Sequence, residues 1–208
     1  MSKELSHKEI TDYFRSNIYE AISSYNAWKM LSYSKSNKVV SDDMAKRYLE
    51  IQNYHPGFFA TAERAFLVDF VIMSLHPFDH RDDSYSLYKI NKEDTEDFIN
   101  NNESVVAALR NLRNKLFAHR DADINNTKNL IIPSVVNQNK YFENLIDFYN
   151  KLTSVVDESS TNFVNAKEIK LDIENLFMNL YRGEAIRKKQ IDIEWLWEKD
   201  NKKASDIL

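Results

Sequence analysis

The sequence predicts an all-α fold, a single bundle of five or six helices, on three observations. Only 2 Gly and 3 Pro occur among 208 residues, and β-sandwiches and barrels need many more turn residues than that. Hydrophobic residues make up 43% of the chain, which is enough for a buried core. Along most of the sequence these residues recur at spacings of three and four, the period of an amphipathic helix.

The first two predicted helices begin at capping sequences. Ser6, followed three residues later by Glu9, forms a capping box. An apolar seam at helical spacing follows it: Ile10, Phe14, Ile18, Ala21, Tyr25 and Trp28. Ser41, with two aspartates after it, opens the second helix, and the Tyr-His-Pro-Gly sequence at residues 54–57 ends that helix.

A third helix and a fourth helical region flank a polar loop. The third helix is expected to end near Leu75, because Pro77 disfavours helical geometry in the residue before it. Its seam is Phe58, Ala62, Phe66, Phe70 and Met73. Residues 76–91 are expected to form the loop, with a short Ser-Leu-Tyr-Lys element. The fourth region runs from about residue 92 to 118, and the pattern leaves open whether the helix is interrupted at residues 100–102. Its seam is Phe98, Val105, Leu109, Leu112 and Leu116.

Two further helices complete the bundle. Their seams are Tyr141, Leu145, Phe148, Leu152 and Val155 in the fifth helix, and Phe163, Ala166, Ile169, Ile173, Leu176 and Leu180 in the sixth. Gly183 is predicted to cap the sixth helix. No Gly-, Pro- or Ser-rich linker divides the chain. We therefore predict one bundle over residues 1–185 and a C-terminal extension over residues 186–208, which contains Trp195 and Trp197 and docks on the bundle or on a partner.

The composition also excludes several classes of protein. With no cysteine, disulfides, thiolate metal sites and a Cys nucleophile are excluded, and two glycines cannot build a Gly-rich phosphate loop. The longest nearly apolar stretch, residues 65–75, is too short to span a bilayer, and the N-terminus has no apolar signal core. We therefore expect a soluble, cytoplasmic protein without a membrane partner.

Cationic residues are concentrated in one part of an acidic chain. The net charge of −4 is not that of a bulk nucleic-acid binder. Nevertheless, Arg110, Arg113 and Arg120 lie within 11 residues of one another, together with Lys115 and no acidic residue. Such a local cationic site suits a focused anionic target. The same stretch contains His119, the residue type that titrates near neutrality.

Helical geometry separates Arg113 from His119. At about 100° per residue, His119 continues the seam of Leu112 and Leu116, whereas Arg113 lies about 100° round the helix from Leu112. The two side chains meet only if the helix ends between them or if a second copy of the helix supplies its own pair. A structural interpretation stays open, and spacing alone favours it: Lys, Arg and His are common in a last helical turn, where they complement the helix dipole.

The stretch from Arg113 to His119 resembles the signature of the HEPN superfamily (higher eukaryotes and prokaryotes nucleotide-binding domain). That signature is an Arg, commonly followed by a polar residue, and a His a few residues later, late in a helix of an α-helical bundle. The Arg120-Asp121 pair and the upstream Ser-Leu-Tyr-Lys sequence at residues 86–89 further resemble the abortive-infection, phage-defence branch of the superfamily. The HEPN-like bundle would cover roughly residues 6–182.

The resemblance implies a metal-independent endoribonuclease that works as a homodimer, with the motif helices of two protomers flanking one composite site. In that site His119, one copy per protomer, would act as base and acid. Arg113 would stabilise the charged phosphorus, and Asn114 would bind the phosphate or orient the imidazole. The candidate RNA-binding residues are Arg110, Lys115 and Arg120.

The resemblance also implies a toxin or phage-defence (abortive infection) effector. No cofactor or metal is expected, and the implied partners are RNA, a second copy of the chain and an antitoxin or regulatory protein. Some family members are controlled through a tyrosine two residues after the histidine; Asp121 occupies that position here, so we do not expect this regulation. The alternative function is a non-catalytic HEPN-like module that binds a nucleotide or a protein.

A second cluster of polar residues precedes the fourth helical region. It contains His76, His80 and several carboxylates, which are residue types that bind metals. Pro77 prevents the two histidines from forming a helical i,i+4 pair, so a solvated loop is the favoured interpretation. This loop is also a candidate border of the active cleft.

Overall fold

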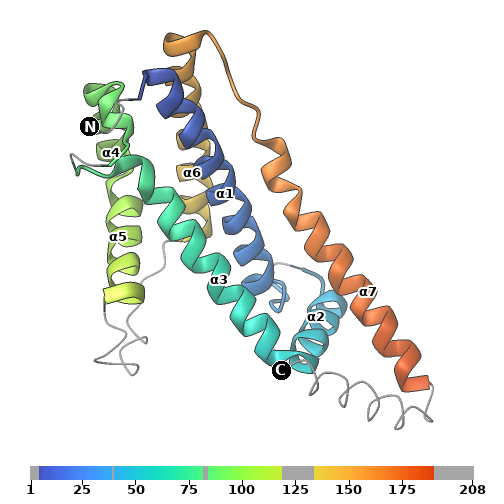
Figure 1. Ribbon diagram of the computed structural model, residues 1–208. Helices are drawn as coiled ribbons and strands as arrows, with labels where there is room; N and C mark the ends of the chain where they lie inside the picture. Colours follow the sequence, from blue (N-terminus) through green and yellow to red (C-terminus); the bar gives the residue numbers. More distant parts are fainter. Residues whose placement is uncertain (1–4, 39, 82–83, 119–133, 190–208) are drawn as a thin grey trace, which may run out of the picture.

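The computed structural model describes residues 5–38, 40–81, 84–118 and 134–189, and all regular secondary structure in these ranges is helical (Figure 1). This confirms the predicted all-α class. The α-helices in the described ranges are α1 (His7–Tyr33), α2 (Asp42–Tyr54), α3 (Pro56–Leu75), α4 (Lys92–Asn101), α5 (Glu103–Ala118), α6 (Val135–Asp157) and α7 (Ile169–Lys189). Short 3₁₀ helices are η1 (His76–Phe78), η2 (Leu87–Lys89) and η4 (Val164–Lys167).

Serine caps start helices where the local sequence predicts them. At the start of α1, the Glu9 amide donates to Ser6 Oγ (3.3 Å) and the Ser6 amide donates to Glu9 Oε2 (2.9 Å), which completes the capping box. Ser41 Oγ accepts from the Met44 amide at the start of α2 (3.4 Å). These bonds satisfy amide groups that have no partner within a helix, so the starts follow from a few neighbouring residues.

The number of helices differs from the prediction because the fourth region is two helices, separated by Asn102. The Asn102 side chain donates to the Phe98 carbonyl at the end of α4 (2.8 Å), and the Asn102 carbonyl accepts from the Val106 amide at the start of α5 (3.0 Å). Asn144 of α6 donates to Asn102 Oδ1 (2.9 Å). The prediction of five or six helices is therefore corrected to seven α-helices within the described residues.

The C-terminal helix is longer than predicted. Gly183 does not cap α7, because the helix continues past it and the glycine has no positive φ. Lys188, beyond the glycine, forms an ion pair with Glu50 of α2, so tertiary contacts accompany the extra turn. Residues 186–189 of the predicted extension thus continue α7, and the rest of the extension, with its tryptophans, lies outside the described residues.

The helix α1 is central, and α3, α6 and α7 pack along it (Figure 1). One buried cluster joins most of α1 to α3, α4, α5 and α6, and a second joins the C-terminal part of α1 to α2, α3 and α7. Three residues of the predicted seams lie outside this packing: Phe58 is 62% exposed, Val155 is 82% exposed and Leu176 is 42% exposed. Their spacing marks a helix face but does not show how far neighbouring helices cover it. No helix in the described ranges has the length and apolar character to cross a membrane.

Candidate functional site

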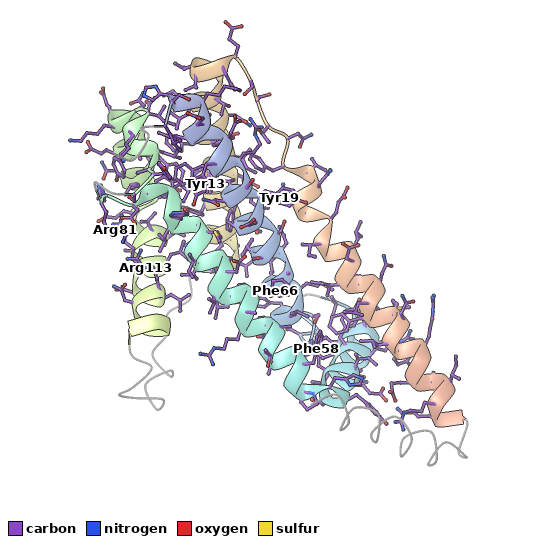
Figure 2. The ribbon with its side chains drawn as sticks, in the orientation of Figure 1. Tyr13, Tyr19, Phe58, Phe66, Arg81 and Arg113 are labelled. Atoms are coloured by element: carbon purple, nitrogen blue, oxygen red, sulfur yellow. The ribbon has the colours of Figure 1, made fainter. Side chains whose placement is uncertain are left out.

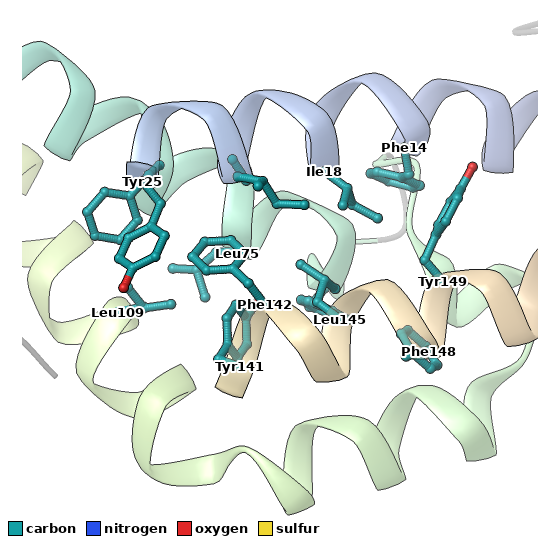
Figure 3. Close-up of a cluster of buried hydrophobic side chains, with 14 of the residues drawn as sticks. Phe14, Ile18, Tyr25, Leu75, Leu109, Tyr141, Phe142, Leu145, Phe148 and Tyr149 are labelled. Atoms are coloured by element: carbon teal, nitrogen blue, oxygen red, sulfur yellow. The ribbon is translucent and has the colours of Figure 1, made fainter. Parts of the chain in front are cut away.

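The candidate site lies on α5, whose inner and outer faces differ. Leu109 and Leu112 are each 1% exposed and belong to the larger core cluster. Leu109 points into that cluster together with residues of α1 and α6 (Figure 3). On the outer face Arg113, Asn114 and Lys115 are exposed, and Arg110 is half-buried. The helix is therefore held by its leucines, and its polar motif residues face away from the core.

The position of Arg113 bears on the structural interpretation. The helix α5 continues to Ala118, and the basic residue in its last turn is Lys115. The effect of the helix dipole falls off within the last turn, so helix capping accounts for Lys115 but not for Arg113. Two residues of the predicted site, His119 and Arg120, lie outside the described residues, directly after the last helical residue in sequence.

The loop between α3 and α4 is anchored in the core. Leu87 of η2 is fully buried, and the ring of Phe78 of η1 stacks on Phe98 of α4 at 5.1 Å between centroids. Ser86 Oγ, which is buried, donates to the Pro77 carbonyl (3.2 Å) and ties the two ends of the loop together. The two ends of the loop are therefore held by buried contacts.

Two of these loop residues, Asp79 and Arg81, form an ion pair (2.8 Å). The hydrogen bond from Arg81 is the largest cause that lowers the pKa of the Asp79 carboxyl below its usual range, and the positive charge of Arg113 lowers it further. Arg113 is therefore close enough to the loop to act on its charges. Figure 2 shows Arg81 and Arg113 on the same side of the molecule. In the described part of the chain, no ion pair involves Arg113.

The same loop contains a pair of rings, one of which is close enough to Arg110 to sense its charge. The His80 ring lies 4.1 Å from the Tyr88 ring, with 37° between their planes. Burial raises the pKa of the Tyr88 hydroxyl, and the charge of Arg110 partly offsets this rise, so Arg110 lies near the tyrosine. His76 takes part in a different contact, a hydrogen bond between Asn17 Nδ2 and His76 Nδ1 (3.0 Å). The two histidines thus have separate partners, and no metal-binding group of three or more side chains occurs within the described ranges.

The structure brings together predicted and unpredicted residues. Arg110 and Arg113 lie beside the loop that we expected to border the cleft. Arg81, His80 and Tyr88 are added to the site by the fold. Their signal in the sequence is a loop that carries an arginine, a histidine and a tyrosine and precedes the motif helix, but this signal cannot show which way the loop folds back.

The arrangement can bind a phosphodiester with a neighbouring base. The guanidinium of Arg113 presents planar donors that match phosphate oxygens. Of the His80–Tyr88 pair, His80 is exposed and Tyr88 is half-buried, and accessible ring faces are surfaces on which unpaired bases stack. Arginines with a pair of rings near them are therefore suited to a short segment of single-stranded nucleic acid.

Comparison of the chain with models of protein families, with curated proteins and with solved structures gave no match.

Proposed function

We propose that this chain is a metal-independent endoribonuclease with a HEPN-like bundle, which acts as a homodimer and as a toxin or phage-defence effector. Its substrate would be RNA, cleaved at a composite site that contains the motif residues of two protomers. The proposal includes an antitoxin or regulatory protein as a further partner, because an uncontrolled ribonuclease would damage the cell that makes it.

One observation carries the proposal: the face of α5 that bears Arg113 is turned outward beside a second cationic and aromatic element. Arg113 is exposed, lies before the last helical turn and acts on the charge of Asp79. An arginine that served only to cap the helix would not need this position. The sequence resemblance and the surroundings of Arg113 therefore favour the same interpretation.

The proposed reaction needs no metal ion. A base removes the proton of the 2′-hydroxyl, and the 2′-oxygen attacks the phosphorus. The bond to the 5′-oxygen breaks, and an acid protonates that oxygen. The products are a 2′,3′-cyclic phosphate and a free 5′-hydroxyl. The imidazole of His119, one copy per protomer, would serve as base and acid, and Arg113 would stabilise the extra negative charge on the five-coordinate phosphorus.

The geometry of a single helix supports a homodimer. The helix α5 extends as far as Ala118, and at about 100° per residue two side chains six residues apart point about 120° away from each other. Arg113 and a helical residue at position 119 would therefore lie on different faces of one helix. Pairing of two motif helices would bring the Arg113 of one protomer next to the His119 of the other.

The test is an RNA cleavage assay with the full-length protein. Arg113→Ala should lower the cleavage rate by about 10²–10³, and His119→Ala by about 10²–10⁴. Arg182→Ala is the matched control, since Arg182 is an exposed arginine on α7, and it should cleave like the wild type. Activity should persist in EDTA, and a substrate with 2′-deoxy sugars should not be cut.

Two further measurements separate the proposal from its alternatives. The wild type should have the mass of a dimer in solution, and its expression should arrest growth while His119→Ala does not. Normal cleavage by His119→Ala, or the absence of any cleavage by the wild type with and without a partner, would contradict the catalytic function. Binding of a nucleotide or protein without turnover would support the non-catalytic module instead.

A further inference from the structure

A cavity of about 220 Å³ lies between α1, α6 and η4, elements that do not carry Arg113. At about 30 Å³ per water molecule its volume corresponds to about seven waters, which suits a small ligand rather than a polymer. The side chains that matter for recognition are Ile22, Phe142 and Ile146 on its apolar part, and Lys29, Lys167 and Asn139 on its polar part.

The polar part of the cavity has an ordered ammonium group. Lys29 Nζ donates to Asn139 Oδ1 (3.2 Å) and lies over the ring of Tyr25, 4.7 Å from its centroid. The Tyr25 hydroxyl donates to the same Asn139 oxygen (2.8 Å). The ring of Tyr25 in turn stacks on Phe142 of α6, at 4.8 Å between centroids (Figure 3). These contacts hold Lys29 in place, but all its partners are neutral.

No ion pair joins this ammonium to a carboxylate in the described part of the chain. Burial, and then the charges of Lys170 and Lys167, lower the pKa of Lys29. Lys170 is itself paired with Glu174 (3.6 Å), so Lys29 and Lys167 are the two cations at the cavity without an ion pair in the described ranges. Two ammonium groups close together repel each other, which lowers the stability of the folded protein. An anion bound between them would remove this repulsion.

The charge balance indicates the kind of anion. Glu143 also lines the cavity and would repel an anion from its side, which directs the anion to the lysines. Two ammonium groups match a dianion better than a monoanion, and lysines are common phosphate-binding residues. The apolar part leaves room for a small hydrophobic group attached to the phosphate.

We propose that this cavity binds a small phosphomonoester, with its phosphate between Lys29 and Lys167 and its apolar group against Phe142. None of its lining residues belongs to the proposed active site, and the proposal does not depend on ribonuclease activity.

The experiment titrates the full-length protein with phenyl phosphate and follows binding by NMR chemical shifts and by thermal stabilisation. Inorganic phosphate and benzyl alcohol, which carry the charge alone and the ring alone, are the comparison probes. Lys29→Gln and Lys167→Gln should each weaken the binding of phenyl phosphate about tenfold, the size expected for one charge-assisted contact. Lys140→Gln is the matched control, because Lys140 is an exposed lysine of α6 that does not line the cavity, and it should bind like the wild type.

Three results would overturn the proposal: no binding of phenyl phosphate at millimolar concentration, unchanged binding in both lysine variants, or equal binding of benzyl alcohol. Inorganic phosphate that binds as tightly as phenyl phosphate would overturn the apolar half of it. Lys167 is exposed, so its variant gives an interpretable result even if Lys29→Gln alters folding. Arg113→Ala should bind phenyl phosphate normally, which distinguishes a failure of this site from a failure of the proposed ribonuclease.

Discussion

Substitution by alanine should change the free energy of unfolding strongly at one of two neighbouring residues of α5 and hardly at the other. Leu112 is 1% exposed and packs in the core, whereas Arg113 is exposed. Leu112→Ala removes three carbon atoms, which is worth about 2.4 kcal/mol of transfer free energy, and the remaining cavity adds to this cost. We expect a loss of about 3–4 kcal/mol in the free energy of unfolding, which lowers Tm by roughly 6–16 °C. Arg113→Ala should change the free energy of unfolding by less than about 0.5 kcal/mol.

The assay is urea and thermal unfolding followed by far-UV circular dichroism, at equal protein concentrations because a dimer makes Tm depend on concentration. Each variant, in its folded state, is then compared with the wild type in the cleavage assay. A loss of more than about 1 kcal/mol in Arg113→Ala would refute the reasoning, since it would show a structural role for the arginine. A loss below about 1 kcal/mol in Leu112→Ala would show that the inner face of α5 is not packed as described.

Two other predictions test contacts around the site. Tyr141→Phe removes the hydrogen bond that the buried Tyr141 hydroxyl donates to the Ser74 carbonyl (2.9 Å); it should cost about 1 kcal/mol and lower Tm by about 2–4 °C, and an unchanged urea midpoint would contradict this contact. Arg113→Ala should raise the pKa of the Asp79 carboxyl, because a positive charge that favours its ionised form is removed. An NMR titration of the Asp79 carboxyl measures this shift, and the same pKa in wild type and variant would show that Arg113 lies elsewhere.

Local signals predicted most of the helices. The Ser6 capping box and the Ser41 cap start α1 and α2, and α3 ends at Leu75, just before Pro77. Each of these signals acts between residues a few positions apart, so it can be read without knowing the rest of the fold. The inward face of α5 was predicted in the same way, since Leu109 and Leu112 recur at helical spacing and are both buried.

Sequence patterns led to a wrong prediction, or left two outcomes open, where distant contacts decide the backbone conformation. Gly183 resembles a helix cap in sequence, but the last turns of α7 lie against α2, where Lys188 pairs with Glu50. The sequence left open whether the helix breaks at Asn102. The structure has a break there, and Asn144 of α6 contacts the Asn102 side chain. Glycine at a helix end and asparagine within a helix are each compatible with two backbone conformations, and packing selects between them.

The sequence by itself determined that this protein is helical, which faces of most helices are apolar, and that Arg113 lies in a cationic stretch without acidic residues. Only the tertiary structure decided that the charge of Arg113 on the motif helix acts on Asp79 of the loop, and that Lys29 lines a cavity between α1 and α6. The physical reason is range: capping and periodicity act over one or two helical turns, whereas a site assembled from several helices depends on how their buried faces pack together.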